Sequence, residues 1–407
     1  MPARELDLVL FGATGFVGRL TAEHLSATAP VGLRIGLAGR SRDRLEQVRD
    51  RLGAAAGTWQ LLHADSTDAA SLRSLAASTR VVVSTVGPYL RHGIPLVRAC
   101  AEAGTDYADL TGEVLFVREV IDRFHEAARA SGARLVTSCG FDSVPSDLAV
   151  HLLHQRAGAD GAGGLTDTTL RVQRLKGGLS GGTIDSMRLQ VRTAAEDPML
   201  RRVVTDPEAL SGGVPGAPGQ RDVWTPFADA ETGQWDAPFV MASYNTRLVR
   251  RSNALLGRGY GPRFRYREVT PVGDGLRGRL RAQALTAALG ALLLGLSTPG
   301  LRAVVDRVLP SPGQGPSEES RRSGSFRMET TTTTEDGRRY AASIAAQGDP
   351  GYAATSVMLG QSGLVLAVDG DRCSAEGGVL TPAVAMGDVL VERLRAQGFE
   401  LSVREVE

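Results

Sequence analysis

Three glycines near the start of the chain have the spacing of a phosphate-binding turn. Gly12, Gly15 and Gly18 follow an apolar stretch at 6–11 that is typical of a β-strand, and a helix-forming stretch comes next. The first glycine permits a tight turn, the second lets a pyrophosphate approach, and the third allows the helix to pack closely on the strand. Free N–H groups at the helix start then bind the anion. The predicted dinucleotide-binding residues of this loop are Gly12, Thr14, Gly15, Phe16 and Val17.

The end of the second predicted strand, at 33–38, indicates which dinucleotide is bound. An NAD site usually has a carboxylate here to bind the ribose 2′-hydroxyl. This chain has Arg40, preceded by Gly39 and followed by Ser41. A guanidinium can hold a 2′-phosphate through charge-assisted hydrogen bonds, so we expect NADP(H), with Arg40 and Ser41 at the phosphate. The alternative is that Arg40 and Arg42 only cap a surface helix.

Residues that follow later strands should face the same ligand, because ligands of doubly wound sheets bind beyond the carboxyl ends of the strands. Asp65 and Ser66, after the third strand, are predicted near the adenine. Gly87, after the fourth strand, would allow close approach to the nicotinamide ribose. The predicted cofactor contacts from the later strands are Val86, Gly87, Pro88 and Cys139.

Four residues are candidates for chemistry. Tyr89 or His92 could supply the proton that a reduced substrate needs, although either could instead cover the core or cap a helix. Asp142 could orient a substrate or serve as a helix N-cap. Thr183 ends a glycine-rich stretch that could lie against a ligand or form a plain turn. The catalytic set that we predict is Tyr89, Asp142 and Thr183.

The order of elements predicts an α/β fold. Up to about residue 147, six short apolar strands alternate with helices, which indicates a Rossmann-like, doubly wound parallel sheet for 1–147. The alternation then stops, so 148–370 should form a second, α+β domain. The segment 371–407 has a helical apolar spacing and should return to pack on the first domain.

Composition narrows the class of protein. The net charge of the 407-residue chain is +1, which argues against a nucleic-acid partner. Its 3 cysteines form no closely spaced pair, and its 6 histidines have no metal-ligand spacing, so we expect a reducing compartment and no metal. No leader precedes the first strand, and we expect a cytoplasmic protein. Its oligomeric state is not predictable from these features.

One segment, 247–301, departs from this neutrality. Between Arg247 and Arg281 there are ten arginines and only two acidic residues, followed by an uncharged Leu- and Ala-rich stretch at 284–296. As a helix this stretch would rise about 20 Å, too short to cross a bilayer. It could be a buried helix, lie peripherally on the inner face of the plasma membrane, or dock an acidic acyl carrier domain or a polyketide synthase.

Several longer motifs resemble those of the saccharopine dehydrogenase-like oxidoreductases. The resemblance covers nearly the whole chain and, within that family, is nearest to the bacterial trans-acting enoyl reductases. The motifs are Gly-Ala-Thr-Gly-Phe-Val-Gly at 12–18, Ala-Gly-Arg-Ser at 38–41, Val-Gly-Pro-Tyr at 86–89, Asp-Leu-Thr-Gly-Glu at 109–113, Cys-Gly-Phe-Asp-Ser-Val-Pro-Ser-Asp at 139–147, Ser-Gly-Gly-Thr at 180–183, Gly-Asp-Pro-Gly-Tyr at 348–352 and Gly-Gly-Val-Leu-Thr-Pro-Ala at 377–383.

The resemblance implies hydride transfer from NADPH to an enoyl substrate of lipid or polyketide type. It names no proton donor. Two alternatives remain: a saccharopine dehydrogenase-like reductase of another substrate, and a non-catalytic NADPH-binding protein of lipid surfaces.

Overall fold

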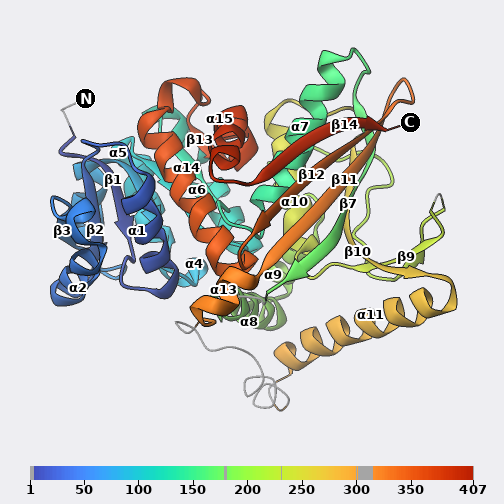
Figure 1. Ribbon diagram of the computed structural model, residues 1–407, viewed down its shortest axis with the longest axis horizontal. Coiled ribbons are helices and arrows are strands. Elements are labelled where there is room, and N and C mark those ends of the chain that lie inside the picture. Colours follow the sequence, from blue (N-terminus) through green and yellow to red (C-terminus); the bar gives the residue numbers. More distant parts are fainter. Residues whose placement is uncertain (1–3, 178–180, 231, 299, 301–314, 407) are drawn as a thin grey trace.

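The computed structural model describes residues 4–177, 181–230, 232–298, 300 and 315–406, and two seven-stranded sheets organise this part of the chain (Figure 1). The first sheet has the strand order β13-β6-β5-β4-β1-β2-β3, and all of its pairings are parallel. Its strands are β1 (Leu6–Phe11), β2 (Ile35–Gly39), β3 (Gln60–His63), β4 (Thr79–Ser84), β5 (Asp106–Ala108), β6 (Arg134–Val136) and β13 (Gly378–Leu380).

The first sheet confirms the predicted doubly wound fold. Six strands come from the N-terminal part, and the seventh, β13, arrives from the C-terminal segment to pair with β6. Buried strands with helices on both faces are what a parallel sheet requires. The helices of this part are α1 (Phe16–Thr28), α2 (Arg42–Leu52), α3 (Ala69–Ser78), α4 (Tyr89–His92), α5 (Ile94–Ala103) and α6 (Val114–Ser131), with a short 3₁₀ turn at Gly53–Ala56.

The second sheet is mixed, in the order β14-β12-β11-β7-β10-β9-β8. Its neighbours are antiparallel except for the parallel pair of β7 and β10. Its strands are β7 (Leu165–Lys176), β8 (Phe227–Ala228), β9 (Gln234–Pro238), β10 (Arg265–Asp274), β11 (Ser325–Thr334), β12 (Arg339–Gln347) and β14 (Glu400–Val406). The accompanying helices are α7 (Val144–Ala159), α8 (Gly181–Glu196), α9 (Pro198–Thr205), α10 (Ala242–Leu255), α11 (Gly275–Ser297) and α13 (Glu318–Ser323).

The last part of the chain joins the two sheets. After the short turn Pro350–Ala354, α14 (Thr355–Val368) packs on α1 and β4 of the first sheet. After the 3₁₀ turn Gly370–Arg372 and β13, α15 (Pro382–Ala396) packs on α14 and α7, and β14 then pairs with β12 of the second sheet. The predicted return of the C-terminal helix to the first sheet is therefore confirmed, although the last strand of the chain belongs to the second sheet. One continuous cluster of buried apolar side chains extends from β1 through α14 and α7 to β12.

Helix α11 corrects the prediction for 284–296. The helix begins at Gly275, so it has 23 residues and takes in the three arginines at 277, 279 and 281. At about 1.5 Å per residue it is about 34 Å long, so the argument that it is too short to cross a bilayer fails. The buried-helix alternative is also wrong, because only Gly278, Ala282, Gly295 and Leu296 are buried.

Two described helical stretches meet the length and composition of a membrane span, Gly275–Ser297 and Pro350–Val368. The second is mostly buried and is a core helix. The first packs one side on β9, β10 and α8, as Figure 1 shows along the lower right of the molecule, where it lies outside the body of the second sheet.

Candidate functional site

In the loop after β1, neighbouring backbone segments lie too close together to leave room for side chains at the glycine positions. Gly12 has a φ of +88°, a conformation that favours glycine. A Cβ at Gly18 would lie 2.2 Å from the carbonyl oxygen of Gly12, and that oxygen belongs to backbone that cannot move away. The glycines therefore bring the start of α1 directly over the end of β1.

The N-terminus of α1 is suited to an anion. Its N-cap is Gly15, and among the described residues no side chain caps the helix and no acidic residue lies in its first turn. The first N–H groups of a helix have no intrahelical acceptor, and the helix dipole adds positive charge there. Phe16, the first helical residue, packs edge-on against Tyr352, with ring centroids 5.0 Å apart. This loop fits the pyrophosphate of a dinucleotide.

Arg40 and Asp65 follow neighbouring strands, as predicted. Arg40 is exposed at the end of β2, and Asp65 comes after β3, which pairs with β2. The pKa of the Asp65 carboxyl is lowered, chiefly by hydrogen bonds from the amide and the hydroxyl of Thr67 and then also by the charge of Arg40. Ser41 caps α2 by accepting a hydrogen bond from the Arg44 amide. The exposed guanidinium fits a 2′-phosphate, whereas a ribose-binding carboxylate is not at this position.

His92 lies near this cluster. Burial lowers its pKa, and the charges of Arg91 and Arg40 lower it further, while Asp65 raises it. His92 is not among the residues that line the cavity described below. The geometry therefore favours a place for His92 beside Arg40 and Asp65 over a role as proton donor.

Tyr89 holds two loops together. Its buried hydroxyl donates a hydrogen bond to the Ser84 carbonyl (3.0 Å) and accepts one from the Leu110 amide (3.2 Å). Burial raises its pKa well above the ordinary value. Because the single phenol hydrogen is already donated to the backbone, the predicted role of Tyr89 as proton donor gains no support from these contacts. Its backbone amide is held by Glu113.

The loops after β4 and β6 form a wall beside the glycine turn. The hydroxyl of Thr85 donates to the Gly12 carbonyl (3.1 Å), which ties the loop of Val86, Gly87 and Pro88 to the glycine turn. Cys139 is fully buried and its thiol donates to the Val136 carbonyl (3.5 Å), so its side chain lies behind the wall. The surface that faces the cavity at this point is Gly140.

A cavity of about 440 Å³ begins at this wall. Its nucleotide end includes Gly15, Gly87 and Pro88, and from there it extends between α8, α10 and the second sheet to α11. The far end is apolar. Its lining includes Val191, Val223, Trp224, Phe239, Val240, Met241, Leu289 and Leu293.

Asp142 and Thr183, which were both predicted near the substrate, lie side by side in the wall of the cavity. The Thr183 hydroxyl donates a hydrogen bond to Oδ2 of Asp142 (3.3 Å). Burial raises the pKa of Asp142 to about 6. Asp142 precedes α7, whose N-cap is Ser143, and Ser143 makes no side-chain capping bond there. The helix-cap alternative for Asp142 is therefore not supported.

Sequence reasoning missed a second acid in this cavity, Glu268 on β10. Its carboxylate is fully buried and accepts hydrogen bonds from the Tyr266 hydroxyl (2.9 Å) and from Nδ2 of Asn245 (2.9 Å). Burial raises its pKa to about 7. Strand alternation could have found it, because Tyr266 and Glu268 share one face of β10 while Arg265 and Arg267 share the other.

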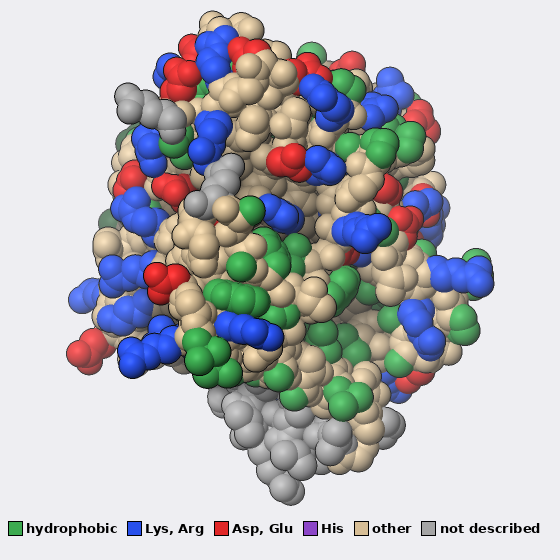
Figure 2. Space-filling model, turned by 90° about the vertical axis from the view of Figure 1, so that its right-hand side faces the viewer, with side chains coloured by type: hydrophobic (Ala, Val, Ile, Leu, Met, Phe, Trp, Pro, Cys, Tyr) green, Lys and Arg blue, Asp and Glu red, His purple; other side chains and the backbone are tan. Residues whose placement is uncertain are grey.

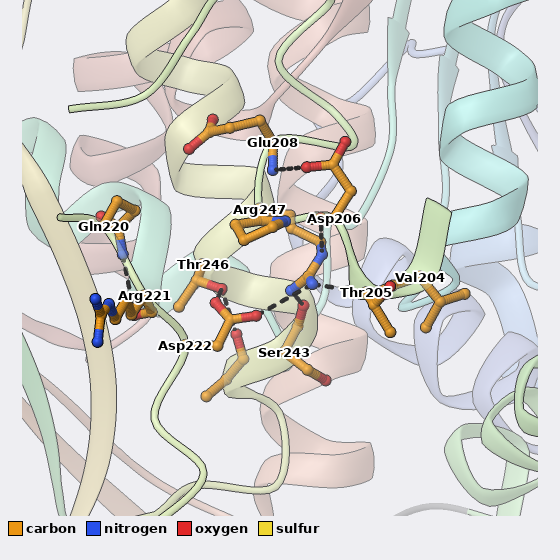
Figure 3. A network of polar contacts seen from close by, with 12 residues as sticks. Val204, Thr205, Asp206, Glu208, Gln220, Arg221, Asp222, Ser243, Thr246 and Arg247 are labelled. Carbon is orange, nitrogen blue, oxygen red and sulfur yellow. Dashed lines mark hydrogen bonds and ion pairs between the residues drawn. The ribbon is translucent and has the colours of Figure 1, made fainter. Parts of the chain in front are cut away.

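The three arginines of the basic segment that lie on α10 are buried. Arg247 and Arg250 both contact Asp222, at 3.1 and 3.2 Å, and Arg247 also donates to the carbonyls of Val204, Asp206 and Ser243 (Figure 3). Arg251 donates to the carbonyls of Leu210 and Val379. The expectation of an external partner is therefore wrong for the α10 arginines. Their contacts fix the segment before Trp224, which forms part of the cavity wall.

Comparison with known proteins assigns the family. Residues 8–136 match the saccharopine dehydrogenase NADP binding domain. A Mycobacterium tuberculosis relative, provisionally named a trans-acting enoyl reductase, is 51% identical over 98% of this chain and 97% of its own. The trans-acting enoyl reductase of Mycobacterium ulcerans is 47% identical over 98% of both chains.

A solved structure is similar in fold. The apo saccharopine dehydrogenase (L-Glu forming) of Saccharomyces cerevisiae superposes with a TM-score of 0.54 at 14% identity, covering 98% of this chain and 99% of that one. This likeness concerns the two-sheet architecture alone. The two mycobacterial relatives and the matching NADP binding domain show that the chain belongs to the saccharopine dehydrogenase-like, NADP-binding oxidoreductases, in the group of the trans-acting enoyl reductases.

Proposed function

We propose that the protein uses NADPH to saturate the carbon–carbon double bond of an enoyl substrate with a lipid-like or polyketide-type chain. One observation supports this most strongly: the cavity that starts at the nucleotide loop is continuous with an apolar end lined by Trp224, Leu289 and Leu293. An apolar chain bound there would place its reactive end beside Gly87 and Gly140. The names of the mycobacterial relatives support the same reaction.

The nucleotide loop and Arg40 are proposed to hold the cofactor. When bound, NADPH supplies a hydride to the β-carbon of the unsaturated carbonyl compound. Phe16 and Val17 would offer backbone N–H groups to the pyrophosphate, and Arg40 with Ser41 would bind the 2′-phosphate. Val86, Gly87 and Pro88 would limit where the nicotinamide lies, with Asp65 and Ser66 nearer the adenine.

Asp142 is proposed to protonate the α-carbon. Its pKa of about 6 allows part of the population to carry a proton near neutral pH. The Thr183 hydroxyl donates to Oδ2, so the proton would be held on Oδ1. Hydride transfer itself needs alignment and exclusion of water, which the apolar walls provide.

The test is reduction of 2-enoyl thioesters by the purified full chain, followed by NADPH consumption and by mass spectrometry of the saturated product. We expect long-chain thioesters to be reduced with NADPH in preference to NADH. Tight NADPH binding without turnover on any chain length would instead support the non-catalytic lipid-surface protein. Turnover restricted to a charged amino-dicarboxylate would support a different reductase.

Replacing Asp142 tests the proton donor. Asp142→Asn should lower kcat at least about 100-fold, the usual contribution of a general acid, while leaving NADPH affinity unchanged. In the wild type kcat/KM should fall as pH rises above about 6, because only the protonated acid can donate. Asp185→Asn is the control, since Asp185 lines the same cavity. Equal losses in both variants would contradict the assignment.

We further propose that the enzyme works in the cytoplasm on substrates that are free or carried by an acyl carrier domain or polyketide synthase. The word trans-acting in the names of the relatives motivates this proposal. Reduction of a carrier-bound enoyl chain at a lower KM than the same chain on coenzyme A would support it.

A further inference from the structure

Helix α11 has two apolar sides with different surroundings. Gly278, Ala282 and Leu296 are buried on one side, against β9, β10 and α8. Leu289 and Leu293, on this same side at helical spacing, line the apolar end of the cavity. The packed side of α11 is therefore part of the substrate-binding region.

The opposite side of α11 is an exposed apolar stripe. At 100° per residue, Leu276, Leu280, Ala287, Ala291 and Leu294 fall along one line that faces away from the packed side. The leucines of this stripe are 71%, 57% and 60% exposed. A contiguous exposed apolar stripe of this length is typical of a surface that binds a partner.

The charges of α11 indicate the kind of partner. Arg277, Arg279 and Arg281 are exposed and flank the stripe on both sides, and residues 275–298 contain no acidic residue. Within the described residues, no ion pair joins these three arginines to a carboxylate, in contrast to Arg247 and Arg250 on α10. Figure 2 views the molecule from the side on which β9 and the start of α11 lie, and green apolar side chains there gather in its lower half among blue arginines.

We propose that α11 docks the protein on an anionic lipid surface, with the stripe immersed between the acyl chains and the arginines at the headgroups. Long basic side chains beside an apolar stripe are the pattern of helices that lie in the membrane interface. A second copy of the chain fits less well, because its α11 would offer no carboxylate to these arginines. Spanning would separate the packed side of α11 from β9, β10 and α8, so the helix lies along the surface.

This docking would connect the lipid phase to the cavity. Leu289 and Leu293 form the apolar end of the cavity on the side of the helix opposite the immersed stripe. A chain dissolved in the lipid would reach the cavity past the edge of α11 without crossing water. This second step rests on the proposed function, whereas docking itself does not.

The experiment is flotation of the full chain with vesicles of phosphatidylcholine, alone or mixed with phosphatidylglycerol. We expect binding to the anionic vesicles, weakened by salt. The triple variant Leu276→Gln, Leu280→Gln, Leu294→Gln should reduce binding by at least about tenfold. The matched control Val31→Gln, Leu256→Gln, Val368→Gln, at exposed apolar residues elsewhere, should bind like the wild type. Arg277→Gln with Arg281→Gln should remove the preference for anionic vesicles.

The outcomes separate docking from catalysis. Reduction of a water-soluble short-chain enoyl thioester should be the same in the triple variant and the wild type, which also shows that the variant is folded. Absence of flotation, or flotation unaffected by the triple variant, would overturn the proposal. So would a change in oligomeric mass on replacing the stripe, because the stripe would then be an interface between copies.

Discussion

The two ends of the cavity are built by different means. At the nucleotide end, backbone atoms of Gly12, Gly15 and Gly18 lie so close that a Cβ at Gly18 would strike the Gly12 carbonyl. At the apolar end, side chains from α8, α11 and the segments at 223–224 and 239–241 form the wall. The nucleotide end is therefore set by a few positions of the chain, whereas the apolar end depends on how distant segments pack.

The largest effect should come from adding one methyl group at the nucleotide end. Gly18→Ala would place Cβ 2.2 Å from the Gly12 carbonyl oxygen, so the turn must distort. We expect NADPH binding, measured by titration calorimetry, to be lost or weakened by at least about 100-fold, because backbone placement fixes the phosphate site. Gly290→Ala, in the exposed part of α11 with open space around it, is the control and should bind normally. Normal binding by Gly18→Ala would remove the distinction between the two ends.

The next largest predicted effect concerns the buried carboxyl group of Glu268, and the quantity that should change is the free energy of unfolding. Glu268 has a pKa of about 7 in the folded protein against an ordinary value of 4.5. Ionising it therefore costs the folded state more than the unfolded state, and this cost grows as pH rises from about 4.5 to 7. Glu268→Gln cannot ionise, so its free energy of unfolding should rise relative to the wild type by about 2 to 3 kcal/mol between pH 5 and pH 8.

Urea unfolding at the two pH values measures this difference. A constant cost of mismatched hydrogen bonding to Asn245 cancels between pH values, so the slope with pH is the informative quantity. Glu102→Gln, at an exposed ion pair with Arg98, should show little change with pH. A flat profile for Glu268→Gln would mean that this carboxyl is not buried in solution.

The third predicted effect concerns the positive charge of Arg40, at the end of β2. Arg40→Ala should weaken NADPH binding by about 10- to 100-fold, corresponding to the loss of one or two charge-assisted hydrogen bonds. NADH binding should hardly change, because NADH has no 2′-phosphate. Arg51→Ala, in the exposed last turn of α2, removes the same charge at a distance and is the control. Parallel losses for the two nucleotides would assign the guanidinium to another part of the cofactor.

The nucleotide end could be predicted because its determinants are local. The order of strand, Gly12 turn and α1, and the place of Arg40 after β2, follow from short-range steric and charge requirements that are visible in consecutive residues. Asp142 was predicted from its place after the sixth strand and Thr183 from the glycine-rich stretch that it ends, whereas their mutual contact depends on the fold. The role of Tyr89 could not be judged, because its hydroxyl is satisfied by Ser84 and Leu110, which are brought to it by the fold.

The substrate end could not be predicted in the same way. The ten arginines between 247 and 281 predict a basic surface. However, Arg247 and Arg250 both form ion pairs with Asp222, which lies more than twenty residues earlier in the chain. Glu268 was counted only as one acid among those arginines, because its burial depends on the packing of α10 and Tyr266. The length of α11 was underestimated because Arg277, Arg279 and Arg281 were treated as the end of the basic segment, although arginine is a good helix former.

The smallest predicted effect separates the two sides of α11. Leu289→Ala shortens a side chain that lines the cavity, whereas Leu294→Ala shortens one that is 60% exposed. For a long-chain enoyl thioester in detergent-free buffer, Leu289→Ala should raise KM by about three- to tenfold, because each buried methylene contributes about 0.8 kcal/mol. A short-chain thioester should not distinguish this variant from the wild type, and Leu294→Ala should leave both KM values unchanged. Equal KM values for both variants on the long chain would show that the acyl chain does not reach α11, and the apolar end would then need another occupant.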